Sequence, residues 1–156
     1  MILAKILDPD AVLCDLKAQN KKQILHELAE GLSAHCSAEP RLIFDALLQR
    51  EKLGSTGLGG GIAVPHGRLP SISRVHGLFA RLATPVDFDS VDGEPVDIIF
   101  ALISPDHAGA DHLTALARVS RLLRDQKILS KLRGTRSKEG LYAIITEPPA
   151  STATAA

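Results

Sequence analysis

The sequence has no net charge and no apolar run long enough to cross a bilayer. Lys and Arg together number 18, as do Asp and Glu, so no basic excess indicates a nucleic acid as partner. The longest purely apolar run, residues 98–103, is far shorter than the roughly 20 residues of a transmembrane helix and predicts a buried strand. Residues 1–8 lack the long apolar segment of a secretory signal. We therefore expect a cytoplasmic protein that binds no nucleic acid and does not insert into a membrane.

Cysteine is also scarce. Cys14 and Cys36 are the only two, and they could pair in principle. A chain of 156 residues that is 45% hydrophobic can bury a core without a disulfide, and the cytoplasm is reducing. We expect free, buried thiols.

Apolar residues recur at helical spacing in several parts of the chain. Asn20 is suited to cap a helix that ends near residues 33–36, and a second helix is predicted from Pro40 to before Gly54. A third helix is expected to open at Asp111. Strands are predicted over 75–83 and 96–103, separated by Pro85 and a turn at 92–93, and further helical segments over 127–132 and 137–145.

This order of elements predicts the fold class. Helices before, between and after strands indicate an α/β sandwich, and the sequence leaves the strand order open. We expect one domain over residues 1–147. Residues 148–156, rich in Pro, Ala and Thr, are expected to form a disordered tail.

A glycine-rich segment lies between the second helix and the first predicted strand. Five of the eight residues from 54 to 61 are glycine, which is too costly in backbone entropy for a regular element. We predict a loop with a function or a loose linker, whose amides could approach an anion. The segment lacks the Gly-Lys-Ser/Thr ending of a nucleotide P-loop, and Ile62 stands where a dinucleotide fingerprint ends in a small residue. Nucleotide binding is not expected.

His66 is the first candidate for chemistry among the six histidines. Pro65 before it stiffens the backbone, and Gly67 after it has no side chain to screen the ring. Neutral imidazole is a nucleophile near pH 7 because its reference pKa of about 6.5 leaves much of it unprotonated. One ring nitrogen must be free while an acceptor holds the other N–H, and either nitrogen fits the sequence. An ordinary polar surface residue is the alternative.

Two more histidines flank the start of the third predicted helix. His112 could support a phosphoryl group on His66 from a helix N-terminus, or be a plain polar residue there. For His107 we favour a solvated loop residue. Arg50 could donate a bidentate pair of hydrogen bonds to phosphate, although a surface arginine without a partner is commoner. The remaining histidines are taken as structural or solvated: His26, His35 and His76.

Metal-binding side chains gather around the same helix start. Asp106, His107, Asp111 and His112 match no zinc spacing, neither HExxH nor paired CxxC. We expect no metal and no cofactor.

Four segments taken together resemble a known family. Residues 50–56, 57–68, 95–102 and 112–116 are similar to the enzyme IIA (EIIA) family of the phosphoenolpyruvate-dependent phosphotransferase system. Within the fructose/mannitol-type members, they look most like the nitrogen-related branch. The resemblance covers about residues 1–147. It implies a mixed β-sheet flanked by α-helices on both faces.

The resemblance also implies a set of site residues. His66 would accept a phosphoryl group from a small HPr-like carrier of the NPr type, with His112 beside it. Arg50 falls on the family's arginine and would contact phosphate or partner. Ser55, Thr56 and Gly67 match the family motif with less defined phosphate- or partner-binding roles. Gly60 stands where family members often vary, which would loosen the loop.

Two functions are compatible with the resemblance. The first is a regulatory phosphocarrier, a phosphotransferase component whose phosphorylation state decides which partners it binds, such as potassium-transport proteins or sensor kinases. The alternative is a sugar-specific EIIA that passes phosphate to a permease IIB domain. A metal-dependent or nucleotide-binding module is the competing class.

Overall fold

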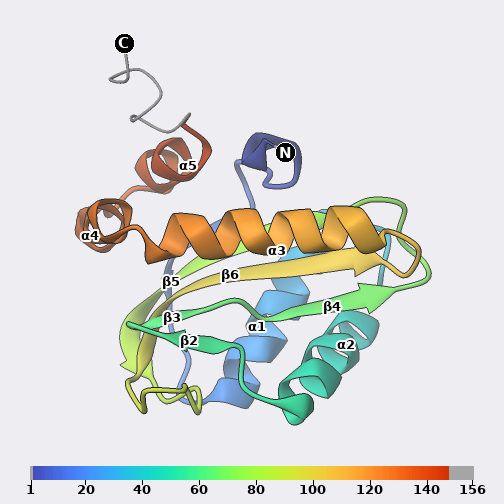
Figure 1. Cartoon of the computed structure of the whole chain (residues 1–156), viewed down its shortest axis with the longest axis horizontal. Coiled ribbons are helices and arrows are strands. Elements are labelled where there is room, and N and C mark those ends of the chain that lie inside the picture. The colour runs from blue at the N-terminus through green and yellow to red at the C-terminus, as the bar shows by residue number, and fades with distance from the viewer. Residues whose placement is uncertain (1, 148–156) are drawn as a thin grey trace.

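The computed structural model describes residues 2–147 and contains one six-stranded sheet with helices packed against it (Figure 1). The predicted disordered tail, 148–156, lies outside the described residues. The strands are β1 (Val12–Leu16), β2 (Gly57–Gly59), β3 (Ile62–Ala63), β4 (His66–Leu69), β5 (His76–Val86) and β6 (Val96–Pro105). The helices are the 3₁₀ helix η1 (Leu3–Lys5), α1 (Lys21–Ser33), α2 (Pro40–Leu53), α3 (Gly109–Arg124), α4 (Gln126–Gly134) and α5 (Lys138–Thr146).

The sheet is mixed. Its order is β1-β5-β6-β3-β2, and β4 pairs with β6 beyond the end of β3. β1 is parallel to β5, and β3 and β4 are parallel to β6, whereas the β5–β6 and β2–β3 pairs are antiparallel. α1 and α2 cover one face and α3 covers the other (Figure 1). The predicted mixed sheet flanked by helices on both faces is therefore confirmed.

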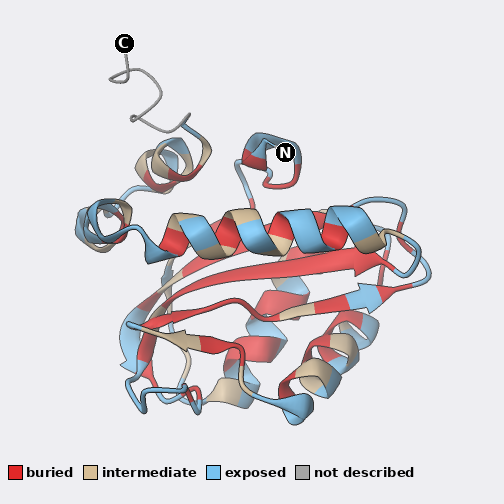
Figure 2. Ribbon diagram, in the orientation of Figure 1, coloured by how far each residue is buried: buried red, intermediate tan, exposed pale blue. Residues whose placement is uncertain are grey.

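Burial explains why β6 is so apolar. Every residue of β6 is buried except Asp97, which is half-buried, because helices cover both faces of the strand (Figure 2). Ser104, near its end, is the one uncharged polar side chain in this strand and is fully buried. β6 thus forms the centre of the core and carries the strand β4 on which His66 lies.

Local capping sets the helix starts much as expected. The Asn20 side chain accepts a hydrogen bond from the Gln23 amide at 2.9 Å and caps α1, and Pro40 occupies the first turn of α2. α3, however, begins at Gly109 rather than Asp111. The earlier start lets the backbone N–H of His112 bond to the carbonyl of Ala108 at 2.8 Å.

Two other expectations need correction. The strand predicted to end before Pro85 continues through it, since β5 ends at Val86. The proline is tolerated because the pairing with β6 shifts register there, so that no N–H of residue 85 is needed for a hydrogen bond between the strands. Cys14 and Cys36 are free, as expected, but both are half-buried rather than buried. Cys14 Sγ lies 2.9 Å from the carbonyl oxygen of Arg136, which gives the thiol a polar neighbour.

The glycine-rich segment is more ordered than a loose linker. Gly59, Gly60 and Gly61 have positive φ angles of 93°, 67° and 83°, and together they turn the chain between β2 and β3. The Gly60 amide donates to Asp92 at 2.9 Å and its carbonyl accepts from Arg133 at 2.8 Å. Gly60 therefore lies in a turn that two side chains hold by hydrogen bonds, and the prediction that it loosens the loop is wrong.

This turn is also remote from His66. β3 pairs Ile62 with Ile98, whereas β4 pairs His66 with Leu102 on the same strand. Four strand residues span about 13 Å, so the glycine turn lies more than one helix diameter from the ring. The amides of this turn are therefore too far from His66 to reach a phosphoryl group on it, whereas the other end of the glycine-rich segment, at Gly54, is joined to His66 through Arg50.

Candidate functional site

His66 is the first residue of β4, and its ring is fixed by a backbone carbonyl. Nδ1 lies 2.9 Å from the carbonyl oxygen of Val64. Because a carbonyl oxygen only accepts, the neutral ring carries its proton on Nδ1 and leaves the lone pair on Nε2. His66 is half-buried, so the ring is held firmly while one edge remains accessible.

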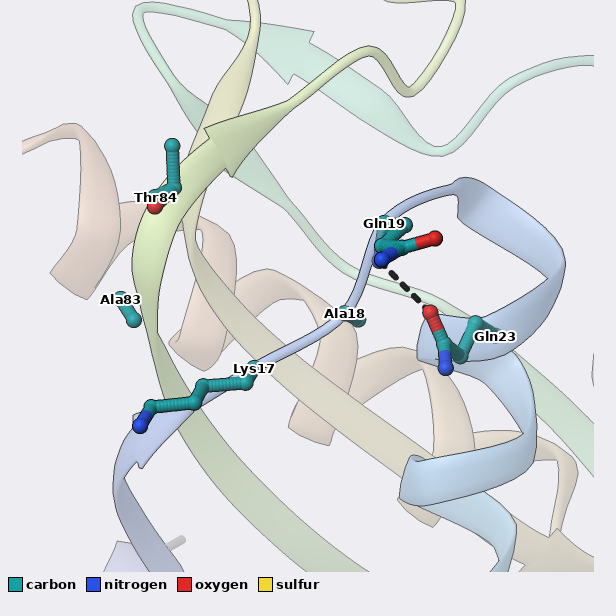
Figure 3. Close-up of a pocket in the computed structure, with 6 residues that line it drawn as sticks. All are labelled: Lys17, Ala18, Gln19, Gln23, Ala83 and Thr84. Carbon is teal, nitrogen blue, oxygen red and sulfur yellow. Dashed lines mark hydrogen bonds between the residues drawn. The ribbon is translucent and has the colours of Figure 1, made fainter.

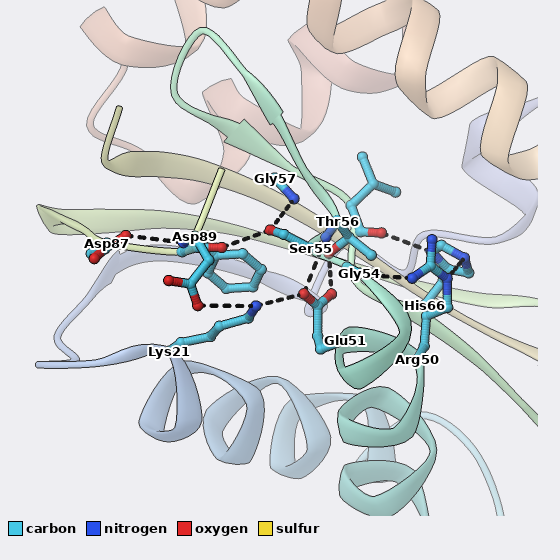
Figure 4. Close-up of polar contacts among 12 residues, drawn as sticks. Lys21, Arg50, Glu51, Gly54, Ser55, Thr56, Gly57, His66, Asp87 and Asp89 are labelled. Atoms are coloured by element: carbon cyan, nitrogen blue, oxygen red, sulfur yellow. Dashed lines mark hydrogen bonds and ion pairs between the residues drawn. The ribbon is translucent and has the colours of Figure 1, made fainter. Parts of the chain in front are cut away.

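Arg50 contacts that free nitrogen. Its Nε donates to His66 Nε2 at 3.2 Å, and its Nη1 donates to the carbonyl of Gly54 at 2.9 Å (Figure 4). The guanidinium therefore bridges the last turn of α2 and the edge strand β4. A planar cation in this position is suited to bind an anion attached to Nε2.

Gly67 allows α2 to approach β4 closely. A Cβ at this position would lie 3.0 Å from Ala46 Cβ and 3.1 Å from the Ala46 carbonyl carbon, which is too close for a side chain without movement. Gly67 is itself buried. The missing side chain of Gly67 would face the helix that carries Arg50, so its observed role is packing, and a contact with phosphate or partner stays a prediction.

His112 lies across from His66 on α3. The centroids of the two rings are 5.5 Å apart with their planes tilted by 54°. His112 is only 4% exposed, and its Nδ1 lies 2.6 Å from Ser104 Oγ on β6. The interpretation of His112 as a plain polar helix residue therefore fails, because such a residue would face solvent.

Both rings are neutral near pH 7. Burial lowers the pKa of His66, and the nearby guanidinium groups of Arg50 and Arg68 lower it further against the opposing effects of the Val64 carbonyl and Glu51. Burial together with Arg68 and His66 lowers the pKa of His112 to about 4. The site thus combines two uncharged imidazoles with two arginines.

Ser55 and Thr56 are engaged in the structure instead of facing the site. Ser55 Oγ donates to the Phe88 carbonyl at 2.7 Å and accepts from the Gly57 amide at 3.0 Å. Thr56 is buried, and both its amide and its hydroxyl donate to the Glu51 carboxylate (Figure 4). Both hydroxyls therefore form hydrogen bonds within the fold, and the binding roles expected for these two residues stay predictions.

Glu51 organises this structural network and was not singled out from the sequence. Besides Thr56, it binds Lys21 Nζ at 2.9 Å, and Lys21 also lies 4.7 Å from the centre of the Phe88 ring. The carboxylate joins α1, α2 and the segment after α2 directly beside Arg50. Its buried charge is compensated by a cation and two donors, and this arrangement fixes the helix end.

Arg68 and Ser104 were also not singled out as site residues. Arg68 lies two residues after His66, and side chains alternate along a strand, so both project from the same face of β4. Ser104 pairs with Arg68 in the β4–β6 ladder and contacts His112. Ser104 could have been noticed in the sequence, because its hydroxyl directly follows the longest apolar run.

The other residues weighed near the start of α3 lie at the surface. His107 and Asp111 are exposed. Within residues 2–147, no group of three or more His, Cys, Asp or Glu side chains is arranged to hold a metal ion. No helix in that same part is long and apolar enough to span a membrane.

One surface hollow lies apart from the histidine pair. It has a volume of about 350 Å³ and lies between the end of β1, the start of α1 and the end of β5 (Figure 3). The Gln19 amide donates to Gln23 Oε1 at 2.6 Å across its wall. Its lining residues are Lys17, Ala18, Gln19, Gln23, Ala83 and Thr84. None of these belongs to the His66 cluster, which lies where β4 begins.

The site thus consists of a half-buried histidine held by a backbone carbonyl, a buried second histidine and an arginine, at the edge of a mixed sheet. The family model for the phosphoenolpyruvate-dependent sugar phosphotransferase system, EIIA 2, matches residues 5–147. The chain belongs to this family, which confirms the resemblance noted in the sequence.

The relatives indicate the branch of the family. The Nitrogen regulatory protein of Bradyrhizobium diazoefficiens is 50% identical over 153 residues, which cover 98% of this chain and 100% of the relative. The Nitrogen regulatory protein of Escherichia coli is 40% identical over 146 residues, covering 93% and 90%. The crystal structure of nitrogen regulatory protein IIA-Ntr from Neisseria meningitidis superposes with a TM-score of 0.88 at 36% identity, covering 92% and 99%.

The fold extends to a sugar-type member. IIA mannitol from Escherichia coli gives a TM-score of 0.74 at 22% identity, covering 88% of this chain and 97% of that chain. At this identity the likeness concerns the fold alone.

Proposed function

We propose that this protein is a regulatory phosphocarrier of the nitrogen-related phosphotransferase system, and that His66 accepts the phosphoryl group on Nε2. The observation that carries the proposal is the hydrogen bond from Nδ1 to the Val64 carbonyl, which leaves Nε2 as the free nucleophilic nitrogen. The donor is the phosphohistidine of an HPr-like carrier of the NPr type. Residues 1–147 act as one domain in the cytoplasm.

The transfer is a single in-line displacement at phosphorus. The Nε2 lone pair of His66 forms the new N–P bond while the N–P bond of the donor breaks, and its electron pair returns to the donor imidazole. The proton on Nδ1 stays against the Val64 carbonyl, which stabilises the positive charge that the ring gains. No separate base is needed because the ring is already neutral.

Arg50 has two positions in this cycle. In the free protein its Nε donates to Nε2, so the guanidinium must move aside before attack. Afterwards it binds the phosphoryl oxygens, where charge has increased. His112 supports the same group without being modified.

Phosphorylation changes the surface on which partners dock. The group adds about −1.5 to −2 charges at one site. In the free protein, Arg50 and Arg68 make this site positive, so the modification cancels most of the local positive charge. Partners that bind one form, including potassium-transport proteins or sensor kinases, are thereby released or recruited.

The proposal is tested by phosphorylation from purified components. Incubation with phosphoenolpyruvate, enzyme I and an NPr-type carrier is expected to give one acid-labile, base-stable phosphoryl adduct on the intact protein. His66→Ala is expected to lose it completely, whereas His107→Ala, a matched change at an exposed histidine, is expected to keep it. Uptake of the label by His66→Ala contradicts the assignment.

A sugar-specific EIIA is the second candidate. A fructose-specific EIIABC component from Bacillus subtilis is 29% identical over 94% of this chain and 23% of that relative. A complex of Escherichia coli IIA mannitol with phosphorylated IIB shares the fold at a TM-score of 0.74 and 20% identity, covering 90% of this chain and 98% of that chain. Phosphorylated protein mixed with a fructose-type or mannitol-type IIB domain separates the two. Efficient transfer favours the sugar function, and retention of the label favours the regulator.

A further inference from the structure

Ser104 is a buried hydroxyl with a single hydrogen-bond partner. Ser104 has no exposed surface, and among the described residues the only hydrogen bond of Oγ is the one with His112 Nδ1, at 2.6 Å. A serine hydroxyl can both donate and accept, so this contact permits two proton arrangements. The two arrangements differ in which atom is left unsatisfied.

In the first arrangement, His112 donates from Nδ1 to Ser104. The serine O–H then has no acceptor in the described core, and a buried donor without a partner is costly. In the second arrangement, the serine O–H donates to an unprotonated Nδ1. Both buried groups are then satisfied, and the neutral ring must carry its proton on Nε2.

We infer that Ser104 is a positioning residue that fixes His112 with its proton on Nε2. The two rings of the site thus hold their protons on opposite nitrogens. The Val64 carbonyl makes His66 a lone-pair donor at Nε2, and the Ser104 hydroxyl makes His112 a hydrogen-bond donor at Nε2. Nothing in the family match assigns a role to Ser104.

The consequence for transfer rests on the proposed function. The ring centroids are 5.5 Å apart and Nε2 is the nitrogen of His112 that Ser104 does not bind, so we expect the Nε2–H to donate to a phosphoryl group on His66. A neutral N–H donor whose ring is held in place by Ser104 stabilises the charge that develops on the phosphoryl oxygens. A ring with the other tautomer would present a lone pair to those oxygens and repel them.

Proton positions in the full chain are measured directly by ¹H–¹⁵N NMR of labelled histidine rings at neutral pH. We expect an Nε2–H ring for His112, an Nδ1–H ring for His66, and a slowly exchanging Ser104 hydroxyl proton coupled to His112 Nδ1. An Nδ1–H ring for His112 overturns the inference, and this readout needs no variant and no phosphoryl donor. It therefore stands even if His66 accepts no phosphoryl group, which would refute the proposed function alone.

Variants test the effect on the reaction. Ser104→Ala is expected to give a mixture of His112 tautomers and to slow phosphoryl uptake about 3-fold to 10-fold, as expected for weakening one donor, with His66 still labelled. Ser104→Thr keeps the hydroxyl and is expected to restore both the tautomer and most of the rate.

The matched control is Ser90→Ala, which removes a buried hydroxyl that has no hydrogen-bond partner in the described chain. An unchanged tautomer and rate in Ser104→Ala, or a loss as large in Ser90→Ala, overturns the inference.

Discussion

His66 and His112 are the same side chain in two different hydrogen-bonding environments. His66 is half-buried at the start of an edge strand and bonds to a carbonyl, which can only accept. His112 is 4% exposed on a helix and bonds to a hydroxyl, which can also donate. The partner of Nδ1, more than the ring itself, therefore separates a nucleophile from a supporting donor.

Removing the supporting ring is expected to have the largest effect short of removing the nucleophile. His112→Ala should slow phosphoryl uptake about 100-fold without abolishing it, because one stabilising donor is worth roughly that much. The measurement is the single-turnover rate from a phosphorylated carrier. His107→Ala should retain the full rate. A loss as complete as that of His66→Ala would show that the two rings do not have separate roles.

Removing the arginine should have a smaller effect on the rate and a separate effect on His66. Arg50→Gln is expected to slow uptake about 10-fold, since charge-assisted hydrogen bonds to the phosphoryl oxygens are lost. It should also raise the pKa of His66, because this guanidinium is one of the groups that lower it. NMR titration of the ring measures the shift.

The matched control for Arg50→Gln lies on the same helix. Arg41→Gln removes an exposed charge that pairs with Asp45 at 3.7 Å, at the opposite end of α2. It should alter neither the rate nor the pKa of His66. A His66 pKa that is the same in Arg50→Gln as in the wild type would contradict the electrostatic part of the account.

A further expected effect concerns the stability of the fold and leaves the transfer rate aside. Because the pKa of His112 is about 4 in the folded protein and near 6.5 when unfolded, the unfolded state binds more protons between these values. The free energy of unfolding should therefore fall as the pH drops from about 6.5 to 4. Above pH 6.5, the contribution of the neutral His112 ring to stability is complete. His66 and His76 contribute in the same direction, since burial lowers both pKa values.

Urea unfolding at several pH values measures this dependence. His112→Gln should flatten the slope between pH 6.5 and 4, and the exposed His107→Gln should leave it unchanged. A slope that is equally steep in His112→Gln would mean that the ring is charged in the folded protein.

Much of the fold follows from local signals, and the site follows from them only in part. α1 and α2 were predicted because Asn20 and Pro40 mark their starts and apolar residues repeat at helical spacing. β1 and β4 were not, because five- and four-residue strands leave too little pattern. The placement of His66 on β4 depends on pairing with β6, which is a tertiary contact.

The site residues divide in the same way. His66 had local indications in Pro65 and Gly67, whereas the expected proximity of His112 and Arg50 came from the family resemblance. The roles expected for Ser55 and Thr56 came from the family resemblance alone. Their partners, the Phe88 carbonyl and Glu51, become visible only once the chain is folded.

The central claim is that the phosphoryl group is carried on Nε2 of His66. ¹⁵N and ³¹P NMR of the phosphorylated protein identifies the modified nitrogen through its one-bond coupling to phosphorus. The account predicts coupling to Nε2 of His66, with Nδ1 still protonated against the Val64 carbonyl and His112 unmodified. Coupling to Nδ1 of His66, or to either nitrogen of His112, would contradict it.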